Sequence, residues 1–449
     1  NQVNLVADDP NAVSRFWNGG TTSPTGTVEG GDGTWTAGSQ TNWTNVSGDF
    51  NKSWAESFAI FQGAPGTVTV SSAEGEVRTT GMQFAVDGYV VTGDPILLSS
   101  SSGTPIIRVG DGTVDGAAYT ATIQSQLAGT GGLQKTDYGT LILTGENTYT
   151  GGTHIASGAL QLGDGGTSGS ILGDVQVDGT LIFNRSDIST FSGVISGTGN
   201  VRQIGSGTTV LTADSSAFGG MTFIELGTLQ VDGKLGGTLS VLSGGILDGS
   251  GEVGSTSVAS GGRVRVAGDG VGTLGIAGDI LFAKGSIYEV NVAADGTSDR
   301  IAATGIATLD GGTVDVRAGS GDYADQTRYT ILTADGGVSG AGFDGATSNM
   351  ILLDPTLEYD ANNVYLVMTR NDRSFCLSGS TTNECHTGRA VEHLGAGNTV
   401  YDAAVQLTAA GARNAFDQLS GEIHASARGV ALQDSAFVRN AAFDRLSAA

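Results

Sequence analysis

One short, glycine-led module recurs along this chain, and it constrains the fold more than any other feature. Each copy has Gly, then Thr or Ala, then alternating apolar residues before the next Gly, Asp or Asn. The copies are Gly139–Gly145 (GTLILTG), Gly158–Gly163 (GALQLG), Gly179–Phe183 (GTLIF), Gly207–Ala213 (GTTVLTA), Gly227–Gly233 (GTLQVDG), Gly237–Val241 (GTLSV), Gly272–Ile276 (GTLGI) and Gly312–Val316 (GTVDV). Several successive copies start at similar intervals, as at 139, 158 and 179 or at 207 and 227, whereas other intervals are shorter or longer.

Four or five residues with alternating apolar positions between glycines are typical of a half-buried β-strand. A repeat of roughly 20 residues is too short for a propeller blade and too long for a hairpin, so it predicts one coil of a β-solenoid. No coil buries its apolar face alone, and neighbouring coils stabilise one another. The alternative is a stack of β-sandwiches, but the sequence shows no regular linkers between such domains. The predicted fold class is therefore all-β, a parallel β-helix with a short helical segment at the C-terminus.

The composition agrees with a turn-rich β-structure and excludes several function classes. The 449 residues include 74 Gly but only 6 Pro, which excludes collagen. Asp outnumbers Glu by 33 to 12, and Asp favours turns whereas Glu favours helices. A net charge of −24 repels phosphate, so no nucleic-acid partner is expected. No apolar run is long enough to span a membrane as a helix, and the start at Asn1 indicates a processed or truncated end.

All four tryptophans lie near the N-terminus, at Trp17, Trp35, Trp43 and Trp54. A solenoid needs a cap over its open first coil, and a cluster of large aromatic side chains suits that role. The same cluster could serve as a ligand platform, for example for sugars. The cap is the favoured interpretation.

The two cysteines, Cys376 and Cys385, are nine positions apart in a polar segment. In an oxidising compartment they would close a small loop, which is worth roughly 2.5–3 kcal/mol in the chain-entropy model. Free thiols and a metal site with His386 and His393 are the alternatives, although this spacing matches no standard zinc pattern. The disulfide is favoured.

The segment 390–449 differs in composition from the rest of the chain. Glycine becomes rare after Ala390, and Tyr401–Leu446 is rich in Ala with spaced apolar residues, as in a helix. Because Gly411, Gly421 and Gly429 interrupt this stretch, the expectation is a broken helix rather than one long helix.

Signals for catalysis are weak. The sequence has no nucleophile elbow, phosphate loop or dinucleotide fingerprint, and no cofactor is expected. It contains four histidines, His154, His386, His393 and His424, and nothing in their spacing indicates a Ser-His-Asp triad. Four Lys in the whole chain also make a polysaccharide-lyase groove a poor fit. The sequence therefore predicts a protein that is not an enzyme, with no catalytic, cofactor-binding or metal-binding residues.

Several segments resemble a known family. Gly131–Gly163 (GGLQKTDYGTLILTGENTYTGGTHIASGALQLG) resembles the autotransporter-associated β-strand repeat. Residues 272–316 resemble the autochaperone or junction region of type V autotransporters, where a Gly-Thr-Leu strand precedes a turn that here reads Ser298-Asp299-Arg300-Ile301. Tyr329–Arg370 continues that region, and Phe416–Ser426 (FDQLSGEIHAS) is similar to the segment that leads into the translocator barrel.

This resemblance implies a Gram-negative protein exported through the periplasm to the outer membrane and cell surface, from which it could be released. Its passenger would be a right-handed parallel β-helix. The implied segments are an N-terminal β-helix part with a Trp-rich cap (1–130), a β-strand-repeat β-helix (131–260), an autochaperone or junction region (261–370), a Cys-loop segment (371–400) and a helical linker (401–449). The linker would lead to the protein's own outer-membrane β-barrel, its expected partner. The oxidising periplasm also favours pairing of Cys376 with Cys385.

Two functions follow from the resemblance as hypotheses. The first is a surface-displayed passenger that acts in adhesion, aggregation or virulence, with a host surface, a matrix or a second copy as partner, and with a C-terminal region that assists its own secretion. The alternative is a stalk that secretes and presents an N-terminal enzyme domain, such as a protease or an esterase, which this sequence lacks. An enzyme within the β-helix itself is the least favoured.

Overall fold

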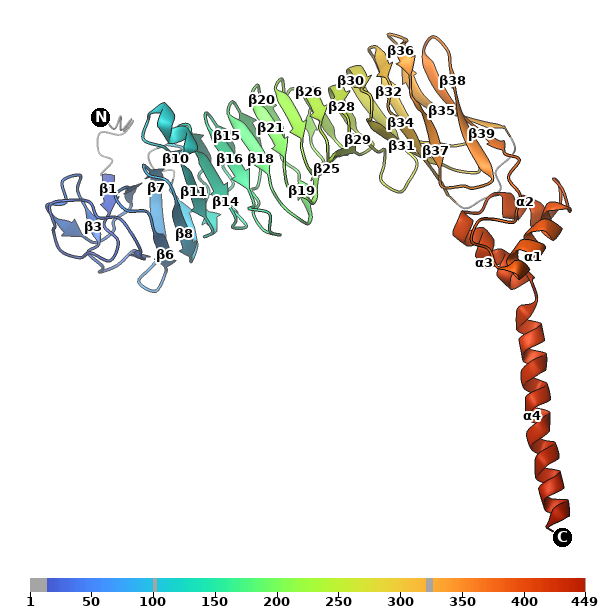
Figure 1. Cartoon of the computed structure of the whole chain (residues 1–449). Coiled ribbons are helices and arrows are strands. Elements are labelled where there is room, and N and C mark those ends of the chain that lie inside the picture. The colour runs from blue at the N-terminus through green and yellow to red at the C-terminus, as the bar shows by residue number, and fades with distance from the viewer. Residues whose placement is uncertain (1–13, 100–102, 320–325, 449) are drawn as a thin grey trace.

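The computed structural model describes residues 14–99, 103–319 and 326–448. Its strands form one long rod, and the helices follow at the C-terminal end of that rod (Figure 1). Three sheets run along the rod, and a short 3-10 helix (Val114–Ala118) interrupts one of the turns.

The first sheet occupies the N-terminal half of the rod. Its strands are β1 (Ser14–Trp17), β3 (Trp43–Thr44), β4 (Asn51–Lys52), β5 (Ser57–Phe61), β7 (Val77–Phe84), β9 (Ile96–Leu98), β10 (Ile106–Val109), β12 (Leu127–Ala128), β13 (Leu133–Thr136), β15 (Thr153–Ile155), β17 (Val175–Val177) and β20 (Ile195–Gly197).

The second sheet runs the whole length of the rod. Its strands are β2 (Gly33–Thr36), β6 (Thr67–Ser71), β8 (Tyr89–Gly93), β11 (Thr120–Ile123), β14 (Thr140–Leu143), β16 (Ala159–Leu162), β18 (Thr180–Phe183), β21 (Asn200–Gln203), β23 (Asp214–Ser215), β24 (Met221–Ile224), β26 (Lys234–Val241), β28 (Glu252–Val258), β30 (Thr273–Phe282), β32 (Arg300–Ala303), β33 (Ala307–Asp310), β35 (Thr327–Ala334), β36 (Val338–Gly342), β38 (Leu353–Tyr359) and β39 (Asn363–Arg370).

The third sheet begins only in the middle of the rod. Its strands are β19 (Ile188–Phe191), β22 (Thr208–Leu211), β25 (Gly227–Val231), β27 (Gly245–Asp248), β29 (Arg263–Val264), β31 (Ile287–Val292), β34 (Thr313–Ala318) and β37 (Gly345–Ser348).

The strand register confirms the predicted β-solenoid. In the second sheet Thr140 pairs with Ala159, Ala159 with Thr180, Thr180 with Asn200 and Asn200 with Met221, all in parallel. The sequence positions of these partners show that each coil in this part of the rod is one repeat long. Each coil carries its apolar side chains inward, where they stack on those of the next coil.

The irregular spacing of the module has a structural cause. The copies that start at 139, 158 and 179 form β14, β16 and β18 of the second sheet, whereas those that start at 207 and 227 form β22 and β25 of the third. The longer interval between 179 and 207 is thus one coil plus the step from one sheet to the next. Each copy of the module thus forms a strand with the turn before it, and this unit occurs in both the second and the third sheet.

A ladder of stacked glycines runs along the second sheet, directly before its strands at the first four positions and inside β26 and β28 at Gly237 and Gly254. Gly158, Gly179, Gly199, Gly220, Gly237 and Gly254 each lie so close to the previous rung that an added Cβ would come within 1.9–2.5 Å of a carbonyl oxygen. Several of them, including Gly179 and Gly199, do not have a left-handed backbone. Close stacking between coils, and not only the positive φ that turns favour, therefore accounts for the abundant glycine.

Aspartates at the corners link one coil to the next, which explains the excess of Asp over Glu. Their short side chains accept hydrogen bonds from backbone N–H groups of adjacent coils. The backbone N–H groups of Thr67, Thr120, Val194 and Ile306 donate to the carboxylates of Asp32, Asp87, Asp174 and Asp279 respectively, at 2.7–2.8 Å. The corner Asp therefore supplies acceptors where no strand pairs with the turn.

Antiparallel strands close both ends of the parallel rod. At the N-terminal end β3 pairs antiparallel with β1 and β4. At the C-terminal end β39 pairs antiparallel with β35 and β38. These pairings cover sheet edges that a parallel stack would leave open.

The C-terminal region contains helices α1 (Thr382–Glu392), α2 (Thr399–Val405), α3 (Ala409–Leu419) and α4 (Glu422–Ser447), and α4 projects away from the rod (Figure 1). Helical structure thus begins before Tyr401, because Thr381 and Glu384 form a capping box that starts α1. The expected broken helix is confirmed. Gly421 is the left-handed N-cap of α4, whereas Gly411 lies inside α3 and Gly429 inside α4, so these two glycines do not interrupt the helices. Of the described helices, none is both long and apolar enough to cross a membrane.

Candidate functional site

The four tryptophans come together at the N-terminal end of the rod. Trp43 lies 4.3 Å from Trp54, 5.1 Å from Trp17 and 5.2 Å from Trp35, measured between ring centroids. Trp54 is 5% exposed and the other three are fully buried. The rings therefore pack on one another and offer no open face to a ligand in this conformation. Among the described residues, the indole N–H groups of Trp35 and Trp43 have no hydrogen-bond partner.

Cys376 and Cys385 form the predicted disulfide. It ties the segment after β39 to the first turn of α1, beside the buried Phe375. His393 donates from Nδ1 to the carbonyl oxygen of Arg389, 2.7 Å away. In the described ranges, no three His, Cys, Asp or Glu side chains are grouped so that they could hold a metal ion.

His154 lies on the outer face of β15, where its Nε2 contacts the Asp178 carboxylate at 2.8 Å. Gln176 donates to the same carboxylate, and these bonds, that of His154 foremost, hold the pKa of Asp178 below its usual range. In strand register, Gln176 separates His154 from Ser196, so these residues do not form a Ser-His-Asp triad. His424 lies outside the residues whose side chains are described.

A buried lysine is the first feature that sequence reasoning missed. Lys135 is fully buried in the inward ladder between Ile107 and Ile155. Its Nζ donates to the carbonyl oxygens of Thr136, Asp137 and Ser157 at 2.9, 3.0 and 3.3 Å. Burial lowers the pKa of Lys135 to about 7, although the Asp137 carboxylate opposes this shift. The signal in the sequence was a Lys at an inward position of the strand LQKT.

The pH dependence of stability should reveal Lys135. An unfolded Lys titrates near 10.4, so between about pH 7 and 10 the unfolded chain binds a proton that the folded chain lacks. Stability should therefore rise with pH in this window, by about 1.4 kcal/mol per pH unit from this residue. We expect Lys135→Met to abolish this contribution. Denaturant unfolding of the native chain and of Lys135→Met at a series of pH values measures this contribution. If the free energy of unfolding of both proteins changes equally with pH between about pH 7 and 10, the prediction is wrong.

A second buried site explains the Ser-Asp-Arg-Ile turn. Asp299 is fully buried, and its carboxylate accepts hydrogen bonds from Gly272 N at 2.9 Å, Asn291 N at 2.8 Å and Asn291 Nδ2 at 2.9 Å. Burial raises the pKa of Asp299 to about 6, against the effect of these donors. Asn291 also donates to Gly268 O and Gly270 O. Asp299 thus ties β31 to the corner that starts β30.

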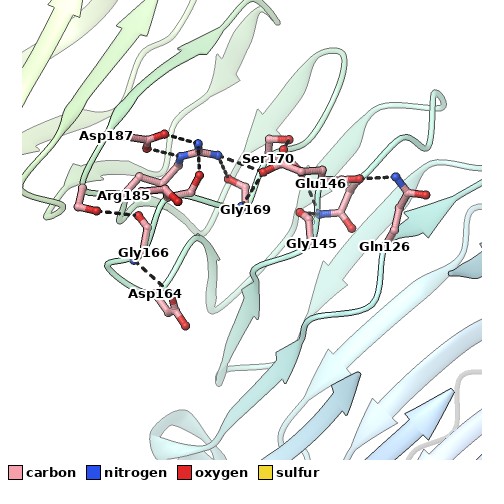
Figure 2. Close-up of polar contacts among 12 residues, drawn as sticks. Gln126, Gly145, Glu146, Asp164, Gly166, Gly169, Ser170, Arg185 and Asp187 are labelled. Atoms are coloured by element: carbon pink, nitrogen blue, oxygen red, sulfur yellow. Dashed lines mark hydrogen bonds and ion pairs between the residues drawn. The ribbon is translucent and has the colours of Figure 1, made fainter. Parts of the chain in front are cut away.

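A third missed site is a polar network around Arg185 in the middle of the rod (Figure 2). The Arg185 guanidinium forms two bonds with the Asp187 carboxylate at 2.8 and 2.9 Å. It also donates to the carbonyl oxygens of Thr167 and Gly169 and reaches Glu146 at 3.4 Å. Glu146 in turn accepts from Gly169 N and Ser170 Oγ. Arg185 thereby fixes the loop of residues 163–170, which contains no strand.

Comparison with known proteins identifies the repeat. The family model of the passenger-associated-transport-repeat matches residues 133–162 and 201–231. Both matches have an inward polar residue at their third position, Lys135 in the first and Gln203 in the second. Gln203 Nε2 donates to Gly205 O, at the place where Lys135 binds Asp137 O. The two repeats thus cap the equivalent turn of the repeat with different side chains, after β13 in the first sheet and after β21 in the second.

Similar proteins include the "Adhesin BmaC autotransporter" of Brucella suis biovar 1 (strain 1330), 36% identical over 327 residues, which are 66% of this chain and 9% of that protein. An "Extracellular serine protease" of Serratia marcescens is 31% identical over 331 residues, 61% of this chain and 31% of the protease. A second protein with that name from Serratia marcescens is 28% identical over a similar span. The chain therefore spans less than a third of the length of each of these relatives. The repeat and these relatives confirm its resemblance to autotransporter passengers.

Proposed function

We propose that this chain is a surface-displayed β-helical passenger segment of a Gram-negative autotransporter, and that it acts in adhesion or aggregation rather than in catalysis. The observation that carries the proposal is the passenger repeat at residues 133–162 and 201–231, which lies within a ladder of coils that runs from β1 to β39. Such a rod presents many weakly binding side chains at regular spacing, and multivalent contact raises avidity without any catalytic residue. The similarity to an adhesin autotransporter also supports an adhesive function.

The protease relatives support a second candidate, a stalk that secretes and presents an enzyme domain. They match over a third or less of their own length, so their name gives no activity to this segment. In this candidate, the rod from β1 to β39 would serve as a rigid spacer for that enzyme domain.

We assign roles in capping, folding and secretion to the two ends of the rod. The Trp-rich segment within residues 1–130 would cap the first coil. Residues 261–370 would fold first outside the cell and serve as a template for later coils, which discourages backsliding. Helix α4 would lead into the outer-membrane barrel. Its apolar residues Phe437, Phe443 and Leu446 are 67–75% exposed, and such exposed apolar side chains are typical of a surface that a partner covers.

Cells that display residues 1–449 on a translocator barrel test the adhesive function. We expect stronger aggregation, or adhesion to a matrix or host surface, at moderate than at very low salt. The reason is that salt screens the −24 charge, with a Debye length of about 8 Å at 0.15 M. Removing residues 1–130 should weaken adhesion but not display, because the proposed template remains.

A matched variant keeps both ends of the rod. Because Asn200 is in register with Thr238 two coils later, removal of residues 200–237 should shorten the rod without changing its caps. Adhesion should fall with the lost coils. Normal display of all forms without any adhesion or aggregation would favour the presenting stalk instead.

A further inference from the structure

The third sheet begins with an unpaired edge in the middle of the rod. Strand β19 is its first strand and pairs with β22 on one side only. The carbonyl oxygens of Asp187 and Phe191 accept bonds from Thr208 and Thr212. Since backbone groups alternate along a strand, those of Ile188 and Thr190 point the other way. Within the described ranges, these groups bond to no other backbone.

The preceding coil does not cover this edge. Its third side is the loop of residues 163–170, and the Arg185 network holds that loop against the residues before β19 (Figure 2). Ser186 N donates to Gly166 O at 2.9 Å, again ahead of the strand. Ile188 is 75% exposed, and Thr190 is exposed as well. The loop is thus fastened beside the edge and leaves it accessible.

Strand β19 also lacks the protective residues that edge strands often carry against pairing. Natural edge strands carry Lys, Pro or inward charges, or are covered. The sequence of β19, Ile-Ser-Thr-Phe, contains none of these residues. Its neighbouring charges, Arg185 and Asp187, neutralise each other through the bidentate contact. The chain carries a net charge of −24, so this neutral stretch is a place where two copies can approach.

We propose that β19 is a self-association edge that pairs with β19 of a second copy of this chain. Antiparallel pairing about a twofold axis uses the same surface on both copies. It can place the exposed Ile188 opposite Thr190 of the second copy, and such β-branched cross-strand pairs are favourable. One short strand from each copy buries far less surface than a stable protein–protein interface of standard size. The dimer is therefore weak in solution and gains strength where many copies share one surface.

Sedimentation of the purified full chain over a concentration series, at about 0.15 M salt where charge repulsion is screened, tests this proposal. We expect a weak, concentration-dependent dimer. Ile188→Lys should raise its dissociation constant by about tenfold or more, because a charged lysine opposes edge pairing. Its side chain is exposed, so the fold should be unaffected.

Met221→Lys is the matched control. Met221 is 48% exposed, but its strand β24 is paired on both sides, with β21 and β26. The control removes an exposed apolar side chain and adds the same charge without touching a free edge, so the dimer should persist. A chain that stays monomeric throughout the series, or a dimer that Ile188→Lys leaves unchanged, would overturn the proposal. Binding of a synthetic β19 peptide by a strictly monomeric chain would also overturn it, because the edge would then serve another extended segment. These outcomes are independent of adhesion by displaying cells.

Discussion

Replacing Gly199 by Ala should destabilise the rod by about 3 kcal/mol or more, as overpacking against rigid backbone does. An alanine Cβ at this position would lie 2.1 Å from the carbonyl oxygen of Gly179 in the preceding coil. Neither atom can move aside, because Thr180 and Asn200, the next residues of both coils, are paired in the second sheet. The two coils must therefore separate locally, and the effect should spread to their neighbours, since each coil depends on the next.

Gly219→Ala is the control for this prediction. Its Cβ would meet nothing nearer than the Thr198 methyl group at 3.7 Å, an ordinary contact. Its stability should stay within about 0.5 kcal/mol of the native protein. Urea unfolding followed by circular dichroism, with limited proteolysis to detect local opening of coils, measures both variants. Equal midpoints for the two would show that the glycine ladder is not closely stacked.

The repeat module predicted the strands of the rod well, because alternation of apolar residues is a local property. All eight copies coincide with strands, from β14 at Thr140–Leu143 to β34 at Thr313–Ala318. The sheet to which each copy belongs could not be predicted. The same module forms a strand of the second or the third sheet, and only contacts between coils decide which.

The polar sites were hidden for the same reason. Lys135 and Asp299 are buried by partners that lie a full coil away in the sequence, such as Ser157 and Gly272. The unpaired edge at Ile188 was hidden too, because it depends on the loop of the previous coil. The disulfide was predictable from the sequence, since both cysteines lie within one short segment.

Replacing Asp299 by Ala should have the largest effect in the proposed template region, residues 261–370. It would leave the backbone N–H donors of Gly272 and Asn291 without their acceptor, whereas Asn291 Nδ2 would keep the carbonyl oxygens of Gly268 and Gly270. Each such loss costs about 1–3 kcal/mol. The corner that starts β30 should separate from β31 as a result. Asp269→Ala is the control, because Asp269 is exposed on the neighbouring loop.

Hydrogen exchange across the whole chain tests most directly whether the C-terminal coils act as the template. We expect the slowest exchange in β30–β35 and β39, and faster exchange at the N-terminal end. There the closing pairs β1–β3 and β3–β4 span two residue pairs each, and buried indole N–H groups lack partners among the described residues. Asp299→Ala should speed exchange in β30–β32, whereas Asp269→Ala should not. Slowest exchange in the N-terminal half, or protection of β30–β32 that survives Asp299→Ala, would contradict a C-terminal folding template.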